Sequence, residues 1–196
     1  MSTQRFERAI EEIDKRNARD PNTQKSGTIE VPDALLYSAR MTAVLEEMYP
    51  DAGEELKIAV RAQHIERWKT PRTTYPEGRA GYHAWRNDLK RSHAQTTGQI
   101  LDQVGYEPAT IELVKDIVAK KNLKSDDNAQ ALEDVACIVF LKFYAQAFAS
   151  KHASDKVQDI LTKTWRKMSQ HAQAHATQIE LPNELQKQID RLANPT

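Results

Sequence analysis

The segment from Ala131 to Ala149, ALEDVACIVFLKFYAQAFA, constrains the fold more than any other part of the chain. From Val135 onward its apolar residues cover nearly every side of a helix, and such a helix has to be buried among other helices. The remaining sequence agrees with this interpretation, because it holds only six glycines and is rich in Ala, Glu, Gln, Lys and Leu. We therefore predict an all-α protein in which this segment is the buried central helix.

Apolar residues spaced three and four apart predict further helices on both sides of this segment. Before it, these helices cover 3–18, 32–48, 54–68 and 82–104, and another contains Ile111 and Val118; after it, one runs from Val157 to His175 and a last one opens at Pro182. The residues from 22 to 31 read as a polar loop. We expect one bundle of about seven or eight helices, with a core over about 5–169 and a C-terminal helical tail over 176–196.

Charge and cysteine usage exclude several classes of protein. The net charge is zero, which argues against broad, nonspecific binding to nucleic acid or to an anionic membrane. The single cysteine, Cys137, cannot form an intrachain disulfide and fits a reducing compartment. The first residues lack an apolar signal core, and no apolar run approaches the roughly 20 residues that span a bilayer. We expect a soluble, cytoplasmic protein.

The stretch 61–91 concentrates positive charge, with eight Lys or Arg residues against three acidic ones, interleaved with aromatic residues. Arginine presents a rigid fork of donors that matches phosphate or carboxylate, and an aromatic neighbour can hold that fork by stacking. An anion site and a solvated basic connection between two helices are both compatible with this pattern. The residues expected to bind an anion are Arg67, Trp68, Arg72, Tyr75, Arg79, Tyr82, Arg86, Lys90 and Lys121. Lys163, Arg166 and Lys167 would add charge if their helix packs nearby.

Three polar residues fall at positions expected to face inward. His64 and His93 lie in the apolar stripes of two predicted helices, and Asp134 stands at the head of the central helix. A buried carboxylate must be neutralised by protonation, by a cation or by a metal. Two histidines and one carboxylate from three helices would suit a divalent ion with open coordination positions. The competing interpretation is two hydrogen-bonded core histidines and a buried salt bridge from Asp134 to Arg61 or Lys121.

Several stretches resemble one protein family nearly end to end. RFERAIEEIDKRNARDPN, RAQHIERWKTPR, YPEGRAGYHAWRNDLKRSHA and LEDVACIVFLKF are similar to the domain-of-unknown-function family 4202, over about 5–169. This resemblance implies no particular activity.

A second resemblance is to the HD-type metal-dependent phosphohydrolases. SHAQTTGQILDQVGYEPATIELVKDIV followed by LEDVACIVFL is similar to their second half, with His93 opening the HxxxGxxIL pattern and Asp134 at the closing aspartate. His64 matches the histidine of the His-Asp pair, but Ile65 replaces its aspartate, and Tyr37 stands where an earlier helix would offer a histidine. The usual metal site is therefore incomplete or rebuilt.

The HD resemblance implies that the all-α bundle is HD-like, and it implies metal-dependent hydrolysis of a phosphate-bearing small molecule such as a nucleotide. His64, His93 and Asp134 would hold a divalent metal that activates water, and Glu66 or Glu133 would move the proton. One alternative is a metal-free module that binds an anionic ligand or RNA through the basic stretch. Another is a redox-active iron in an HD-like scaffold. A shared fold alone does not decide among these functions.

Overall fold

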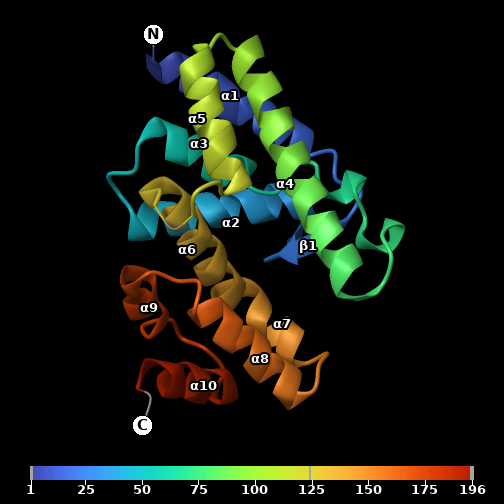
Figure 1. Cartoon of the computed structure of the whole chain (residues 1–196), viewed down its shortest axis with the longest axis vertical. Coiled ribbons are helices and arrows are strands. Elements are labelled where there is room, and N and C mark those ends of the chain that lie inside the picture. The colour runs from blue at the N-terminus through green and yellow to red at the C-terminus, as the bar shows by residue number, and fades with distance from the viewer. Residues whose placement is uncertain (1, 124, 195–196) are drawn as a thin grey trace.

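The computed structural model describes residues 2–123 and 125–194, and it is built almost entirely from helices (Figure 1). This part of the chain contains the α-helices α1 (Ser2–Asn17), α2 (Asp33–Met48), α3 (Glu54–Ala62), α4 (Gly78–Gln103), α5 (Pro108–Ala119), α6 (Asp127–Val139), α7 (Ala145–Ala149), α8 (Ser154–Trp165), α9 (Gln170–Ala176) and α10 (Asn183–Ala193). The all-α prediction is confirmed. Among the described residues, no helix is long and apolar enough to cross a membrane. The predicted tail, 176–196, is described as far as residue 194.

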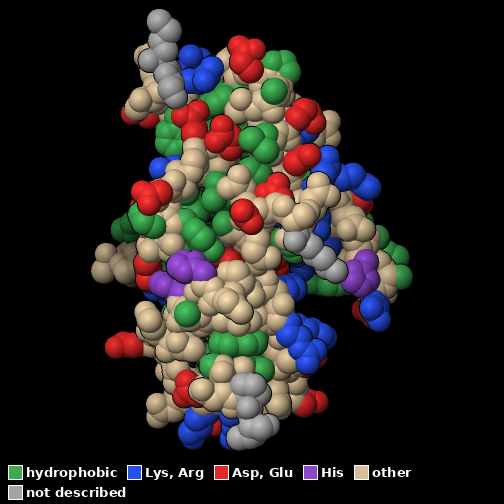
Figure 2. All heavy atoms as spheres, turned by 60° about the vertical axis from the view of Figure 1, so that its left-hand side comes forward, with side chains coloured by type: hydrophobic (Ala, Val, Ile, Leu, Met, Phe, Trp, Pro, Cys, Tyr) green, Lys and Arg blue, Asp and Glu red, His purple; other side chains and the backbone are tan. Residues whose placement is uncertain are grey.

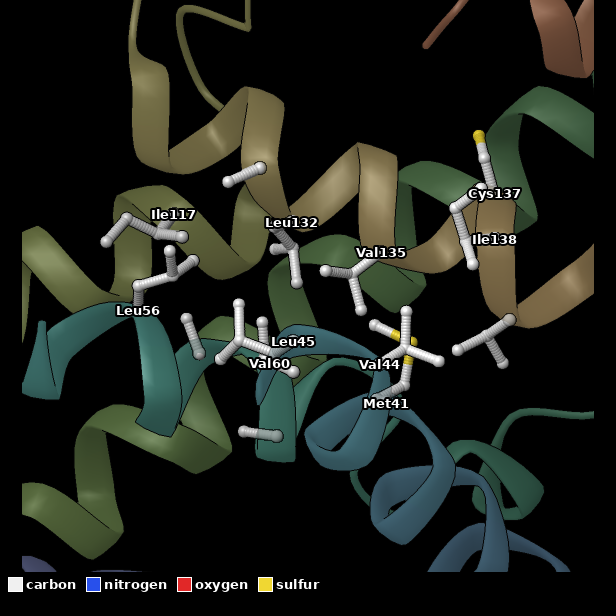
Figure 3. Packing of buried hydrophobic residues seen from close by; sticks show 14 of the residues in the cluster. Met41, Val44, Leu45, Leu56, Val60, Ile117, Leu132, Val135, Cys137 and Ile138 are labelled. Atoms are coloured by element: carbon white, nitrogen blue, oxygen red, sulfur yellow. The ribbon is translucent and has the colours of Figure 1, made fainter. Parts of the chain in front are cut away.

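Helix α6 joins the two ends of the molecule, with α1, α4 and α5 toward one end and α8, α9 and α10 toward the other (Figure 1). Its residues Leu132, Val135 and Ile138 are fully buried and face α2 and α3, where they meet Met41 and Val60 (Figure 3). Burying one aliphatic side chain of this size contributes about 1.5–3 kcal/mol. The apolar face of α6 therefore organises the core, as its sequence predicts.

The central segment is not one continuous α-helix. After Val139 it passes through a π-helical turn, Phe140–Tyr144, before α7 resumes the α-helical geometry. A π-turn adds a residue to the helical repeat and rotates the side chains that follow it. Here it turns Lys142 and Phe143 to the surface, so the segment is buried on all sides only in its first half.

The third predicted helix ends earlier than its apolar spacing suggests. Helix α3 stops at Ala62, and Glu66 adopts a left-handed backbone with φ of 53°. The Glu66 N–H donates to Oδ1 of Asn17 in α1 at 3.2 Å, so this backbone donor finds its partner in another helix. Consequently His64 and Trp68 do not share one helical stripe. They lie in a loop that continues through two short 3₁₀ turns, Arg67–Lys69 and Arg72–Thr74.

Two other expectations are corrected. The region read as a polar loop contains an antiparallel hairpin, β1 (Thr23–Ser26) and β2 (Ile29–Pro32), whose short polar strands give no apolar alternation. The helix predicted from Val157 to His175 is broken after Trp165, and the Ser169 side chain caps the new helix α9 by accepting from the Ala172 N–H.

Gly81 in the first turn of α4 allows the loop before this helix to fold back onto it. A Cβ atom at position 81 would lie 1.9 Å from the carbonyl oxygen of Pro76, so a larger residue does not fit without moving backbone. This close approach fixes where the loop over 63–77, which joins α3 to α4, meets α4.

We predict that Gly81→Ala lowers the free energy of unfolding by about 1–3 kcal/mol, the usual cost of overpacking. Helix propensity alone favours alanine over glycine by about 1 kcal/mol and would give the opposite sign. Ala84→Gly, at an exposed position of the same helix, serves as the control for propensity. Chemical denaturation measures the free energy of unfolding of both variants. A stabilised Gly81→Ala protein would show that the backbone at Pro76 moves away at little energetic cost.

Candidate anion-binding cleft

A cleft of about 930 Å³ brings together residues from most of the chain. Its walls come from the segment before α2, from α2 itself, from the loop after α3, from α4, from α6 and its π-turn, and from the end of α8. The outer part includes two carboxylates that already have partners. Asp20 accepts from the Ala34 N–H at 3.1 Å, and Asp33 accepts from the Gln24 side chain at 3.1 Å.

A smaller chamber of about 180 Å³ adjoins this cleft and is here called the inner chamber. The two cavities share Gln63, His64, Arg67, Trp85, Arg86 and Lys120. The inner chamber is completed by Tyr82, Leu89, Lys90, His93 and Val118. Among these described lining residues there is no aspartate or glutamate, although four of them are Lys or Arg: Arg67, Arg86, Lys90 and Lys120.

The two predicted inward histidines meet at the inner chamber. The ring of His64 stacks on Tyr37, with centroids 4.2 Å apart, and its centroid lies 6.0 Å from that of His93. His93 is only 4% exposed, and among the described residues neither of its ring nitrogens makes a hydrogen bond of regular geometry, although the backbone of Ile65 lies close enough to interact weakly with the ring. Core histidines normally make a regular hydrogen bond, so His93 does not fit the interpretation of a satisfied core residue.

Both histidines are neutral at physiological pH. Burial is the main cause that lowers the pKa of His93 to about 4; the cation of Arg67 adds to it, and the backbone of Ile65 opposes it as the smallest effect. Removal from water, Arg67 and the neighbouring His93 lower the pKa of His64 well below its ordinary value. The chamber therefore disfavours any further positive charge.

The chamber arginines and Lys90 are held in place without carboxylate partners. The Arg67 guanidinium lies over the Trp85 ring at 4.7 Å, and Trp85 Nε1 donates to the Thr70 carbonyl at 2.8 Å. Arg86 donates to the Tyr82 hydroxyl at 3.1 Å. Within the described chain, neither these arginines nor Lys90 forms a salt bridge. Burial lowers the pKa of both Arg67 and Lys90, and Arg86 lowers them further.

This imbalance is local. On the face shown in Figure 2, acidic and basic side chains are interspersed, and hydrophobic side chains appear in small separate groups. The whole chain carries 28 Lys and Arg against 28 Asp and Glu. The inner chamber thus gathers three partly buried cations without salt bridges in the described chain, Arg67, Arg86 and Lys90, although the molecule as a whole is neutral.

Glu133 is the buried carboxylate of the cleft and is held by two lysines. It accepts from Lys120, at the end of α5, and lies 3.4 Å from Nζ of Lys167, just after α8. Burial by itself would raise the pKa of Glu133, but Lys120, Lys167 and Arg86 outweigh burial and lower it. A carboxylate whose pKa is lowered is a weak base, which does not suit the proton-transfer role predicted for it.

Asp134 has a different environment from either of the two predicted. It is fully buried and accepts hydrogen bonds from the Tyr49 hydroxyl at 2.8 Å, the Gln130 amide at 2.8 Å, and the N–H and hydroxyl of Ser169 at 2.8 and 2.5 Å. The predicted salt bridge with Arg61 or Lys121 is wrong, since Arg61 pairs with Asp14 and Lys121 with Asp116. Neutral donors from α6, the end of α2 and the start of α9 satisfy this carboxylate.

The predicted metal ligands are not brought together. In the described part of the chain, no group of three or more His, Cys, Asp or Glu side chains is placed to hold a metal ion. His64 and His93 share the chamber, but both Asp134 oxygens are occupied by donors from other elements. The residues present therefore do not fit the expected three-ligand set.

Comparison with protein families gives one match. A family model described as Domain of unknown function (DUF4202) matches residues 7–189, from α1 into α10. The chain belongs to this family. No curated protein and no solved structure matches it, so these comparisons lend no support to the HD-type resemblance.

In this DUF4202 protein, most of the residues predicted to bind an anion do converge. Trp68 and Arg72 line the cleft, Tyr82 and Lys90 line the inner chamber, and Arg67 and Arg86 line both. Five predicted site residues line neither cavity: Asp134, whose donors are given above, and four others. Tyr75 donates to Asp88 at 2.7 Å, Arg79 reaches His83 at 3.4 Å, Lys121 bonds Asp116 at 2.5 Å, and Glu66 pairs with Lys69 at 2.7 Å.

Other lining residues of the DUF4202 cleft were not predicted. Lys120, rather than Lys121, is the cation from the end of α5, because Lys120 has a left-handed backbone with φ of 54° that redirects the chain. Phe140 and Tyr144 also line the cleft wall. Both follow Glu133 at helical spacing, and this spacing could have indicated that they lie on the same face of the helix. Cys137 points away from Met41 and Val44 (Figure 3) and lines the cleft, where burial raises the pKa of its thiol to about 12.

We predict that Asp134→Asn destabilises the DUF4202 fold by about 2–3 kcal/mol, because hydrogen bonds to a charged acceptor are lost. Ser169→Ala should cost about 1 kcal/mol as a lost helix cap. Since both residues belong to one network, the double variant should lose less than the sum of the two single losses. Denaturant titration of the four proteins checks this, and strictly additive losses would contradict a shared network.

We also predict that the free energy of unfolding falls as the pH drops from 6.5 toward 4. Folded His93 stays neutral in this window while unfolded His93 takes up a proton, so acid favours the unfolded state. Glu133, whose ordinary pKa is 4.5, contributes only at lower pH because its folded pKa is lowered. The slope should be reduced in His93→Leu, where His64 still contributes because its folded pKa is also lowered, and it should persist in full in His83→Leu, an exposed histidine of the same helix. Equal slopes in both variants would show that His93 is accessible to protons in the folded state.

Proposed function

We propose that this protein binds a phosphate-bearing small molecule in the cleft. One observation carries the proposal: Arg67, Arg86 and Lys90 converge on an inner chamber that has no acidic residue in its described lining. Cations gathered in a partly dehydrated space repel one another more strongly than they would in water. A bound anion removes that repulsion, whereas Glu133, the nearby carboxylate that acts on Arg86 and Lys90, forms its salt bridges with Lys120 and Lys167.

Phosphate suits this arrangement better than a single carboxylate does. A phosphoryl group carries up to two negative charges on three acceptor oxygens, which several donors can share. Arginine forks match these oxygens, and the stacking of Arg67 on Trp85 holds one fork in a fixed orientation.

The outer cleft has room for the organic part of such a ligand. Its volume of about 930 Å³ lies within the range of small-molecule sites, roughly 300–1,000 Å³. Its aromatic residues are Tyr37, Trp68, Trp85, Phe140 and Tyr144. Aromatic walls with a few fixed polar groups favour a ligand that contains a planar ring, and a nucleotide meets both requirements.

The proposed compartment of the protein is the cytoplasm. Cys137 is a free thiol, and free thiols fit a reducing compartment.

Hydrolysis and a bound divalent metal stay predictions from the HD resemblance. The described geometry supports binding more directly, because Glu133 is held by lysines and Glu66 lies outside both cavities. RNA binding is less well supported, since a neutral molecule lacks the summed positive charge that binds a long polyanion.

We expect nucleotides to raise the melting temperature of the protein and to bind in calorimetry, while the corresponding nucleosides do neither. Arg67→Met and Arg86→Met should each weaken binding by about tenfold or more, which corresponds to about 1.4 kcal/mol for a lost charged contact. Lys163→Met is the matched control, because Lys163 is exposed and pairs with Asp159 at 2.6 Å.

Two results would redirect the proposal. Binding of single-stranded RNA that depends on Arg67, without nucleotide binding, would favour the RNA module. Phosphate release from a nucleotide, together with stoichiometric metal in elemental analysis of untagged protein, would establish the hydrolase. If nucleotides bind equally well to wild type, Arg67→Met and Arg86→Met, the cleft is not the site.

A further inference from the structure

We infer that the inner chamber receives the terminal phosphoryl group of the ligand, with His93 and His64 contributing hydrogen bonds, so that the ligand is a phosphomonoester or ends in a phosphate. This inference rests on the proposed function, since it assigns one part of the same ligand to one part of the same site. It goes further by stating which kind of phosphate enters.

The first observation is the unsatisfied side chain of His93. Both of its ring nitrogens are buried and neither makes a hydrogen bond of regular geometry among the described residues, so the only hydrogen-bonding group acting on the ring from nearby is the backbone of Ile65, whose effect is weak; the residue is 4% exposed. Leaving a buried polar group unpaired costs about 1–3 kcal/mol. A neutral imidazole has one N–H donor, which a phosphoryl oxygen at the centre of the chamber would accept. A nearby dianion also favours the protonated ring, in which both nitrogens donate.

Gln63 adds a second unsatisfied group on the boundary between the chamber and the cleft. Its side chain is 8% exposed, and its Oε1 has no partner in the described part of the chain. A half-turn of the amide would present its NH₂ group instead, which is a donor suited to an anion. Two buried side chains with unpartnered polar atoms around one small chamber indicate that a polar ligand completes it.

The second observation is the size of the inner chamber. The chamber holds about 180 Å³, is more enclosed than the cleft it adjoins, and has the buried apolar side chains Leu89 and Val118 in its own part of the wall. This volume accommodates one phosphoryl group with a little water, whereas the adjoining cleft of about 930 Å³ leaves room for the rest of the ligand. A phosphodiester continues on both sides of its phosphorus atom, so an internal phosphate of RNA would need two exits. A terminal phosphate needs only one.

The third observation is charge. Lys120 is already paired with Glu133, which lines the cleft but not the chamber. The other chamber cations, Arg67, Arg86 and Lys90, form no salt bridge among the described residues. A monoester carries up to two negative charges near neutral pH and a diester only one. The chamber therefore favours the terminal group by charge as well as by shape.

The experiment compares two matched probes, phenyl phosphate and methyl phenyl phosphate, on the full chain at neutral pH. Calorimetry gives the affinities, and the side-chain nitrogen resonances of the histidines report where each probe binds. We expect phenyl phosphate to bind at least about tenfold more tightly than the diester, a difference of about 1.4 kcal/mol. The His93 resonances should shift with the monoester and stay unchanged with the diester.

Variants of the residues that line the inner chamber test whether the preference for phenyl phosphate arises there. His93→Leu and Lys90→Met should each weaken phenyl phosphate binding by about tenfold or more and leave the diester unaffected. His83→Leu, on the exposed face of α4 and outside both cavities, should change neither affinity. If circular dichroism shows that His93→Leu is unfolded, Lys90→Met decides, because Lys90 is only partly buried.

The outcomes separate this inference from the proposed function. Equal affinity for both esters, unchanged by His93→Leu or Lys90→Met, would overturn the inference and leave nucleotide binding in the outer cleft intact. Failure of the wild type to bind phenyl phosphate while it binds nucleotides with unshifted His93 resonances would have the same meaning. If neither ester nor any nucleotide binds, the proposed function itself fails.

Discussion

The ion pair between Glu133 and Lys120, extended to Lys167, is the interaction on which the cleft depends. One carboxylate on α6 joins the end of α5 to the segment that follows α8, and so ties together parts of the chain that approach from opposite ends of the molecule. Burying such charges is costly, and an apolar substitute would often be as stable. The ion pair instead determines where Lys120 lies, because it keeps this side chain at the chamber wall. Arg67, Arg86 and Lys90 form no salt bridge among the described residues.

The same helix serves both the core and the site because its two faces differ. Leu132, Val135 and Ile138 pack into the core, whereas Glu133 and Cys137 line the cleft. The π-turn that follows allows Phe140 and Tyr144 to continue the cleft wall although the α-helical repeat has been interrupted. Asp134, next to Glu133 in sequence, is directed to Tyr49 and Ser169 and fixes the start of α9. Adjacent carboxylates thus have separate tasks, one electrostatic and one structural.

The sequence indicated the helices, the buried central segment and the basic loop, because apolar spacing and local charge are properties of neighbouring residues. The sequence did not predict the local structure where a contact with a residue far away in the chain determines it. The hydrogen bond from Glu66 to Asn17 accompanies the early end of α3 and so removes His64 and Trp68 from a common stripe. Asp134 was expected to need a cation or a metal, but neutral donors remote in sequence satisfy it. Lys120 lines the cleft and the predicted Lys121 does not, because the left-handed backbone of Lys120 ends the helical spacing.

The geometry also bears on binding as against catalysis. Interactions that hold a phosphate equally well before and during reaction lower its free energy without accelerating any step. Arg67, Arg86 and Lys90 are interactions of that kind, and the two histidines are neutral. A hydrolase also needs a base near the phosphorus atom, yet Glu133 is held ionised by lysines and Asp134 is saturated by donors. If the proposed phosphate ligand binds here, the described residues suit its retention better than its cleavage.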